Sequence, residues 1–236
     1  MKKYFNFLLL IPIIIFIFYI STVKSDSEIN LSELKIIQKT AIQSNISETD
    51  KQVREQAKSE LNLFLKQIPA GKESNYGFEN IAEIHKSEVG IPYRVFTILP
   101  LNLINPAGKI SDNFTSLDEW IVPITVDGNF KAFLTVVKKD NKFETVNFGD
   151  AGLAKEIQKY EEVFNNKKGK IILRQYQLEC DFLIFAESIE NAGNTEVYPL
   201  ESARIVFGKI KFNNVSKNLS EIFKLIRDKY FEKYSN

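Results

Sequence analysis

The strongest constraint on the fold is a pair of alternating apolar segments, residues 119–126 and 130–137, joined by Asp127-Gly128-Asn129. Apolar side chains at every second position belong to one face of a β-strand. A three-residue loop joins two such faces; it pairs Trp120 with Val136, Val122 with Leu134, Ile124 with Ala132, and Val126 with Phe130. A two-residue loop would instead place Ile124 opposite Lys131. The pattern therefore predicts an antiparallel hairpin with a three-residue loop.

Two residues refine this hairpin. Asn129 tolerates the left-handed backbone conformation that the third loop position favours. Pro123 has no N–H to donate to a ladder, which predicts that its strand lies at a sheet edge or carries a bulge.

Further strands and helices surround the hairpin. Residues rich in β-formers predict five more strands, at 93–99, 143–148, 171–177, 181–186 and 203–208. Helical spacing of apolar residues predicts four helices: 53–68 with caps at Ser47 and Asp50, 79–89, a helix capped by Asp150 through Phe164, and a last helix capped by Ser216. Strands in runs between helices, without regular alternation, indicate an α+β domain. We expect a mainly antiparallel meander flanked by amphipathic helices, forming one domain over 47–236.

The chain begins with the pattern of an export segment. Lys2 and Lys3 precede an apolar run from Leu8 to Ile20, which is the order of a signal peptide. As a helix this run reaches about 20 Å, short of the ~30 Å hydrocarbon core, although counting back to Tyr4 approaches the length of a span. Residues 1–25 are therefore predicted to be a signal peptide or a membrane anchor, and residues 26–46 a polar tether. Both alternatives place the domain outside the cytoplasm.

Composition favours an ordinary packed domain. The chain has 31 basic and 30 acidic residues, a balance that gives no electrostatic footprint for nucleic acid. Cys180 is the only cysteine, so no disulfide can form within the chain. The many Lys, Asn, Ile and Phe residues are typical of an AT-rich bacterial genome.

The side chains suited to catalysis or metal binding are few. Cys180 alternates in phase with apolar neighbours, and His85 lies beside the apolar stripe of its predicted helix, so a Cys/His nucleophile pair is disfavoured. One Cys and one His cannot complete a zinc tetrad. The turn "FGDAGLAK", with Gly149 and Gly152, weakly resembles a phosphate-binding turn. A strand-to-helix turn capped by Asp150 explains every residue, so phosphate binding is disfavoured. We expect no metal, no cofactor and no catalytic residue.

Carboxylate chemistry is the alternative enzymatic hypothesis. Asp118 and Glu119 stand beside Trp120, an arrangement found at carbohydrate sites. Adjacent residues of a strand point to opposite faces, so this pair cannot act together unaided. The candidates for an envelope hydrolase are Asp118, Glu119 and Glu187.

The segment from Pro100 to Asp118 is the best candidate for a contact surface. It joins two predicted strands without clear periodicity, and connections longer than about 12 to 15 residues tend to be functional or disordered. Its apolar residues argue against disorder. The predicted site combines this segment with the adjacent strands: Tyr93, Arg94, Leu103, Ile104, Phe114, Asp118 and Trp120.

The sequence thus predicts an exported bacterial envelope protein whose domain binds a partner protein or a small ligand without catalysis. The alternatives are the carboxylate hydrolase and a membrane-tethered structural protein. Nucleic acid is not an expected partner, and the membrane is one only through residues 1–25 if they are not cleaved.

Overall fold

The computed structural model describes residues 47–164, 169–208 and 217–234, and the architecture below refers to these residues. The predicted signal peptide or anchor at 1–25, the tether at 26–46 and the helix cap at Ser216 lie outside them.

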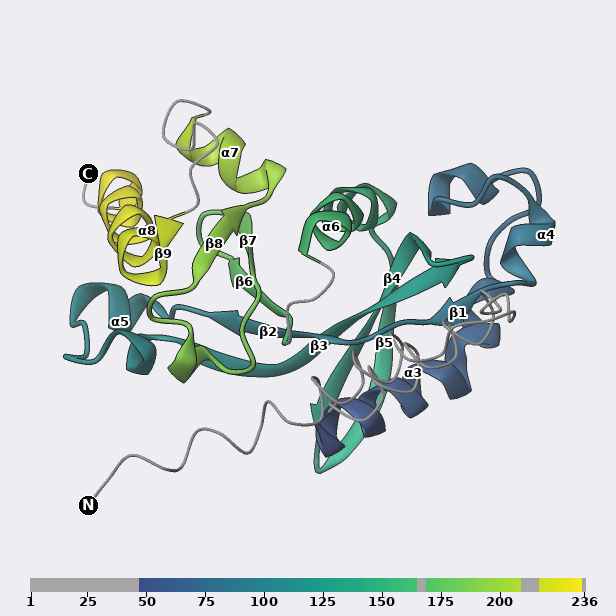
Figure 1. Ribbon diagram of the computed structural model, residues 1–236, viewed down its shortest axis with the longest axis horizontal. Coiled ribbons are helices and arrows are strands. Elements are labelled where there is room, and N and C mark those ends of the chain that lie inside the picture. Colours follow the sequence, from purple (N-terminus) through teal and green to yellow (C-terminus); the bar gives the residue numbers. More distant parts are fainter. Residues whose placement is uncertain (1–46, 165–168, 209–216, 235–236) are drawn as a thin grey trace, which may run out of the picture. The chain divides into compact units, whose positions relative to one another are not determined.

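A single nine-stranded sheet organises the domain (Figure 1). The strands are β1 Glu88–Val89, β2 Tyr93–Thr97, β3 Thr115–Val126, β4 Asn129–Lys139, β5 Lys142–Gly149, β6 Ile171–Gln175, β7 Cys180–Ile184, β8 Glu196–Pro199 and β9 Lys217–Asn218. Their order is β5-β4-β3-β2-β6-β7-β8-β9, with β1 paired to β3. All pairs are antiparallel except β2 with β6. The predicted α+β class with a mainly antiparallel sheet is confirmed, and the sheet consists of two meanders joined by one parallel pair.

The β3–β4 hairpin has most of the predicted register, but with a two-residue loop and a bulge in place of the predicted three-residue loop. Trp120, Val122 and Ile124 pair with Val136, Leu134 and Ala132 as expected. The loop, however, has two residues, Asp127 and Gly128, with φ of 51° and 83°, the conformation of a type I′ turn. Thr125 pairs with Phe130 and Val126 with Asn129. Lys131 is therefore an extra residue, and this bulge restores the apolar register that a two-residue loop would otherwise shift.

Pro123 lies in an inner strand, so the edge alternative is wrong. β4 pairs along one side of β3, whereas β2 and β1 pair along the other. The Pro123 carbonyl accepts the Gly90 N–H at 2.7 Å. Residues 90–92 separate β1 from β2 and interrupt the pairing along this side of β3. The N and O of one strand residue point to the same side, so the missing donor faces this interruption and not β4.

Six α-helices accompany the sheet in the described residues. They are α3 Glu48–Leu65, α4 Ile81–Ile84, α5 Pro100–Ile104, α6 Ala151–Phe164, α7 Glu201–Phe207 and α8 Leu219–Tyr234, with 3₁₀ turns η1 Glu73–Tyr76, η2 Ile110–Asn113 and η3 Ile189–Asn191. None of the described helices has both the length and the hydropathy of a membrane span. Three of the helices, α3, α6 and α8, correspond to predicted ones.

Two predicted elements are wrong. The expected helix over 79–89 is reduced to the single turn α4, followed by β1. Val89 becomes buried by pairing with Ile124 of β3 and not by helical packing. The expected strand at 203–208 is the helix α7, in which Ala203 and Phe207, four residues apart, face the core.

Helices cover both faces of the sheet. On β6, Ile172 belongs to the core cluster that contains Ala154 and Ile157 of α6. Its neighbours Ile171 and Leu173 point to the other face and pack in the cluster of α8. The α3 cluster contains Trp120, Val122 and Ile124 but not Ile121, which belongs to the α6 cluster. One face is thus covered by α6, and the opposite face by α3 over β3 and β4 and by α8 over β6 to β8.

A buried glutamine extends the parallel β2–β6 pairing that connects the two meanders. Gln175 is fully buried at the end of β6. Its Oε1 accepts the Ile98 N–H at 3.3 Å, and its Nε2 donates to the Ile98 carbonyl at 3.2 Å. The side-chain amide thereby continues the parallel β2–β6 pairing past the last backbone pair and satisfies its own polar atoms.

Candidate binding site

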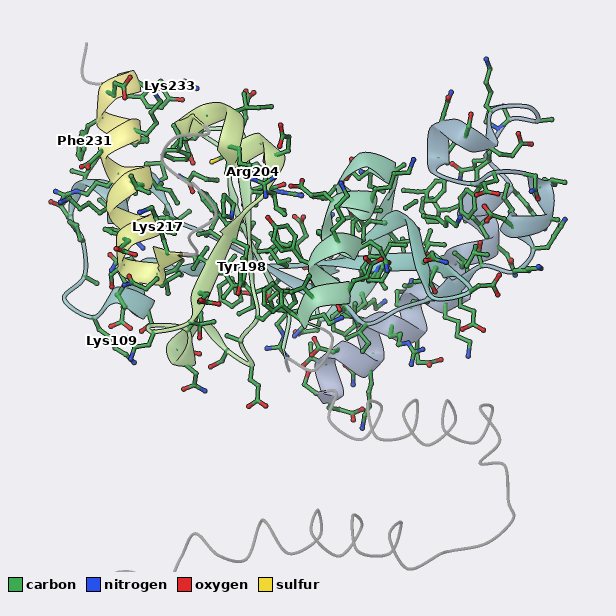
Figure 2. All side chains as sticks on the ribbon, turned by 45° about the horizontal axis from the view of Figure 1, so that its top comes forward. Lys109, Tyr198, Arg204, Lys217, Phe231 and Lys233 are labelled. Atoms are coloured by element: carbon green, nitrogen blue, oxygen red, sulfur yellow. The ribbon has the colours of Figure 1, made fainter. Side chains whose placement is uncertain are left out.

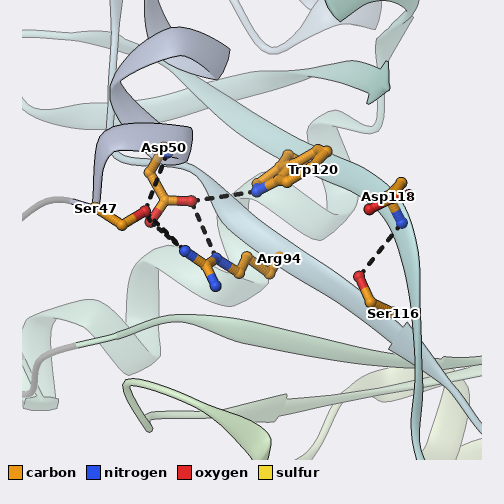
Figure 3. A network of polar contacts seen from close by, with 6 residues as sticks. All are labelled: Ser47, Asp50, Arg94, Ser116, Asp118 and Trp120. Carbon is orange, nitrogen blue, oxygen red and sulfur yellow. Dashed lines mark hydrogen bonds and ion pairs between the residues drawn. The ribbon is translucent and has the colours of Figure 1, made fainter. Parts of the chain in front are cut away.

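Two of the predicted site residues meet at the start of α3 (Figure 3). The Arg94 guanidinium binds Asp50 through Nε–Oδ1 at 3.1 Å and Nη2–Oδ2 at 3.2 Å, and donates to Ser47 Oγ at 2.7 Å. Trp120 Nε1 donates to Asp50 Oδ1 at 3.2 Å. Ser47 Oγ also accepts the Asp50 N–H and so caps the helix. This polar cluster attaches the first turn of α3 to β2 and β3.

Asp118 lies apart from that cluster. It is exposed, with φ of 50°, and its N–H donates to Ser116 Oγ at 3.4 Å (Figure 3). The β2–β3 pairing shifts register here, since Arg94 pairs with Trp120 while Phe96 pairs with Ser116. Asp118 therefore belongs to a β-bulge of β3, and aspartate is among the residues that tolerate a positive φ.

Tyr93 is fully buried beneath α6. Its hydroxyl donates to Glu161, whose other oxygen binds Lys170 Nζ at 2.7 Å. Burial and the neighbouring Glu161 charge raise the pKa of Tyr93 well above its ordinary value. Tyr93 thus connects β2 to α6 inside the domain and has no surface to offer a partner.

The segment Pro100 to Asp118 is a packed structure built from α5, η2 and the start of β3. Leu103 and Phe114 are buried in the cluster of α8. Asn113 is 1% exposed; its Oδ1 accepts the Ala107 N–H at 2.7 Å, and its Nδ2 lies 3.2 to 3.3 Å from the carbonyls of residues 107, 109 and 110. This side chain replaces the regular backbone pairing that the connection lacks.

Helix α5 and its N-cap Leu99 leave three aliphatic side chains in solvent, which we call the α5 patch. Leu99, Leu101 and Ile104 are 42%, 65% and 49% exposed. The other predicted residues of this segment, Leu103 and Phe114, form the underside that fixes the helix. Of the seven predicted site residues, Ile104, Asp118 and in part Arg94 are therefore accessible.

A second feature is a cleft between α6 and α7, which we call the α6–α7 cleft. Its volume is about 780 Å³. Its lining comes from the start and one side of α6, from β6 and β7, and from α7: Asp150, Gly152, Leu153, Lys155, Glu156, Lys159, Tyr160, Arg174, Asp181, Glu201, Ser202 and Arg204. The "FGDAGLAK" turn thus contributes to the cleft through Asp150 and Gly152.

Ion pairs organise the cleft. Arg174 binds Asp181 with Nε–Oδ1 and Nη2–Oδ2 at 3.1 and 3.2 Å, and its Nη1 lies 3.4 Å from Glu119 Oε1. Burial disfavours the guanidinium charge, but the hydrogen bond to Asp181 and the two carboxylate charges outweigh it and raise the pKa of Arg174. Every N of this guanidinium is therefore engaged within the protein.

Arg204 is placed differently. It extends from α7 toward α6 (Figure 2), where Nη1 lies 3.2 Å from Glu156 and 3.3 Å from Glu201, and Nη2 donates to Tyr160 Oη. Burial is the main cause that raises the pKa of Glu156, although the Arg204 charge opposes it. The side chain of Arg204 is 31% exposed, so it remains accessible from the cleft.

The candidate reactive groups occupy ordinary positions. Cys180 is buried, and burial raises the pKa of its thiol to about 12, with a smaller contribution from Asp181. His85 is exposed at the end of α4. In the described part of the chain, no three His, Cys, Asp or Glu residues are grouped as metal ligands.

The three carboxylates of the hydrolase hypothesis are not brought together in the cleft. Asp118 and Glu187 are exposed, and Glu119 binds Arg174 and accepts a hydrogen bond from Tyr176 at 3.4 Å. None of the three is among the described residues that line the α6–α7 cleft. Their proposed catalytic role stays a prediction.

Sequence reasoning missed the α6–α7 cleft because it assigned α7 to a strand. Arg174 and Asp181 carried a usable signal, since opposite charges at equivalent positions of a predicted hairpin indicate a cross-strand pair. No signal of that kind connects Glu156 with Arg204, 48 residues apart.

Comparisons of the chain with protein-family models, with curated proteins and with solved structures found no match.

Proposed function

We propose that this protein is an exported bacterial envelope protein whose domain is a non-catalytic module that binds a partner protein through the α5 patch. The observation that carries the proposal is the exposure of Leu99, Leu101 and Ile104 within six residues. Single exposed apolar side chains are normal on a protein surface, whereas a cluster of them marks an interaction site.

The support beneath the α5 patch favours this role. Leu103, between the exposed residues, is fully buried, and its carbonyl accepts Arg227 Nε of α8 at 2.9 Å. The Asn102 side chain donates to the Asn113 carbonyl at 3.0 Å. A surface held this firmly loses little conformational entropy when a partner binds.

The location of the partner follows from the N-terminal pattern. Residues 1–25, as signal peptide or anchor, would deliver the domain across the membrane, and residues 26–46 would separate it from the bilayer. The partner would then be another protein of the envelope. Mass spectrometry of the native N-terminus distinguishes the two forms: cleavage removes Lys2 and Lys3, whereas an anchored protein retains them.

Site-specific photocrosslinking tests the proposal in cells that express the protein naturally. A photoreactive phenylalanine analogue replaces Leu101 in one variant and Ile205 in a matched control. Ile205 is 73% exposed on α7, so both positions present the probe to solvent. We expect a discrete crosslinked protein from position 101 and none from position 205.

Substitutions then test the chemistry of the contact. Leu101→Ser and Ile104→Ser should weaken the crosslinked complex, detected with the probe at Leu99, while thermal unfolding changes little because both side chains are already exposed. Crosslinks of equal yield from positions 101 and 205, or a complex unaffected by both serine variants, would contradict the proposal.

A further inference from the structure

The α6–α7 cleft has the volume of a small-molecule site and a mainly charged lining. Small-molecule sites occupy about 300 to 1,000 Å³, and this cleft measures about 780 Å³. It opens on the sheet face that α6 covers, since Arg174 and Asp181 alternate with the residues of the α8 cluster. Helix α5, which carries the α5 patch, packs through Leu103 in the α8 cluster on the other face, so the two surfaces are separate.

The cleft carries equal numbers of both charges. Its lining contains four acidic and four basic residues: Asp150, Glu156, Asp181 and Glu201 with Lys155, Lys159, Arg174 and Arg204. A ligand with one sign of charge meets as much repulsion as attraction there. A ligand with both signs can align with both sets, which is the electrostatic complementarity that gives specificity.

The Nε–H donor of Arg204 has no acceptor among the described residues. A guanidinium has five N–H donors, and its bonds to Glu156, Glu201 and Tyr160 use Nη1 and Nη2. Among the described residues, no acceptor binds Nε. The free edge can therefore take a carboxylate, the group that a guanidinium fork matches best.

Two carboxylates that could bind a positively charged group of the ligand lie next to Arg204. Glu156 and Glu201 are both within 3.3 Å of Arg204 Nη1, so a site for a cation adjoins the site for an anion. Such close spacing suits a ligand whose ammonium and carboxylate groups share one carbon. The raised pKa of Glu156 fits this placement, because an ammonium group would compensate for its poor solvation.

We propose that the α6–α7 cleft binds a free α-amino acid, with the ligand carboxylate at Arg204 and the ligand ammonium group at Glu156 and Glu201. Lys155 and Lys159 stand at the exposed rim. The remaining volume would receive the amino-acid side chain, and its neighbours include Leu153 and Tyr160.

Isothermal titration calorimetry on the full chain tests this with the twenty common α-amino acids. For the tightest binder, we compare its carboxamide, which lacks the negative charge, and its deaminated acid, which lacks the positive one. Each analogue should bind at least about tenfold more weakly, the ratio that corresponds to 1.4 kcal/mol. This comparison leaves the protein unchanged and so cannot fail through misfolding.

Variants assign the contacts. Arg204→Lys retains the charge but loses the fork, and Glu201→Gln loses the charge of a side chain that is 55% exposed; both should weaken binding by about tenfold or more. Lys229→Gln is the control, because Lys229 is 30% exposed and ion-paired on α8, outside the cleft. It should leave the affinity unchanged.

Either of two results would overturn the inference: no heat of binding from any amino acid at about 10 mM, a weak limit for specific association, or affinities that ignore both the ligand's charges and Arg204. The result is independent of the α5 patch, since Leu101→Ser should leave amino-acid binding intact. Failure of one proposal therefore does not imply failure of the other.

Discussion

Individual charged residues in this domain mainly hold elements together. Asp50 receives hydrogen bonds from Arg94 of β2 and Trp120 of β3, and Glu161 of α6 binds both Tyr93 and Lys170. Each carboxylate connects a helix to the sheet at a site with little water, where an unpaired partner is costly. Losing one such residue should therefore affect stability before it affects binding.

Asp50→Ala tests this directly. It leaves the Trp120 indole N–H without its acceptor and leaves Arg94 with Ser47 Oγ alone, and it should cost about 1 to 3 kcal/mol. Trp120 is the only tryptophan, so its fluorescence reports on this site alone, and we expect a shift of the emission to longer wavelength as the first turn of α3 loosens.

Glu48→Ala is the matched control for Asp50. Glu48 stands in the same first turn, but its side chain is 75% exposed and its one ion pair within the described residues is with Lys51. Its removal should cost less than about 0.5 kcal/mol and leave the emission unchanged. Equal effects of the two substitutions would show that Asp50 stabilises only the isolated helix.

Alanine substitutions at Gly77 and Gly71 distinguish the cost of a steric clash from the cost of backbone strain. Both have positive φ, 86° and 76°. A Cβ at Gly77 would lie 2.1 Å from the Lys131 carbonyl oxygen, whereas a Cβ at Gly71 meets nothing within 4 Å. Gly71→Ala should cost about 1 to 2 kcal/mol, and Gly77→Ala considerably more. Chemical denaturation measures both, and equal costs would contradict the close approach at Gly77.

At the scale of elements, the sequence predicted those whose periodicity agrees with their environment. The alternation at Trp120, Val122 and Ile124 was enough to set the β3–β4 register, even though the loop length was wrong, because burial of that face selects the register and a bulge at Lys131 adapts the turn. Helices α3, α6 and α8 were predicted because each has a clear apolar stripe.

The elements that were predicted wrongly are determined by contacts with residues far away in the sequence, which a local pattern does not reveal. Residues 203–207 read Ala-Arg-Ile-Val-Phe, a composition that favours a strand, yet Ile205 is 73% exposed and Ala203 faces the core. The same limit explains the candidate site. Leu103 and Phe114 were predicted as contacts because α8, which covers them, is more than 100 residues away in the sequence.

The α4 region should loosen in acid. Lys131 of β4 binds Glu83 at 2.8 Å, and this hydrogen bond, with one from the Glu79 N–H, lowers the pKa of Glu83. The stabilisation is present above the ordinary glutamate pKa of 4.5 and is lost as the pH falls through the lowered folded value. The protection factors of the Ile84 and Ser87 amides, which compare the observed exchange rate with that of an unfolded peptide at the same pH, should fall over that range.

Lys131→Met supplies the control for acid loosening. It removes the charge but retains a long side chain, so the pH dependence of exchange in α4 should flatten. A loss of protection of the same size in wild type and variant would assign the effect to other carboxylates.

At the scale of the whole molecule, two antiparallel meanders share one parallel β2–β6 joint. No local pattern predicts this parallel pair, since it brings together residues more than 70 positions apart. The polar Gln175 at the end of β6, which binds the Ile98 backbone, is the one local sign that β6 ends against another strand. The arrangement leaves the α5 patch and the α6–α7 cleft on separate surfaces.

Protease accessibility of a tag placed after Asn236 tests whether this domain lies outside the cytoplasm, as we propose. A tag avoids dependence on unfolding of the packed α8. Protease added to intact spheroplasts should remove the tag while a cytoplasmic marker protein survives. A tag that remains until the cells are lysed would contradict the account.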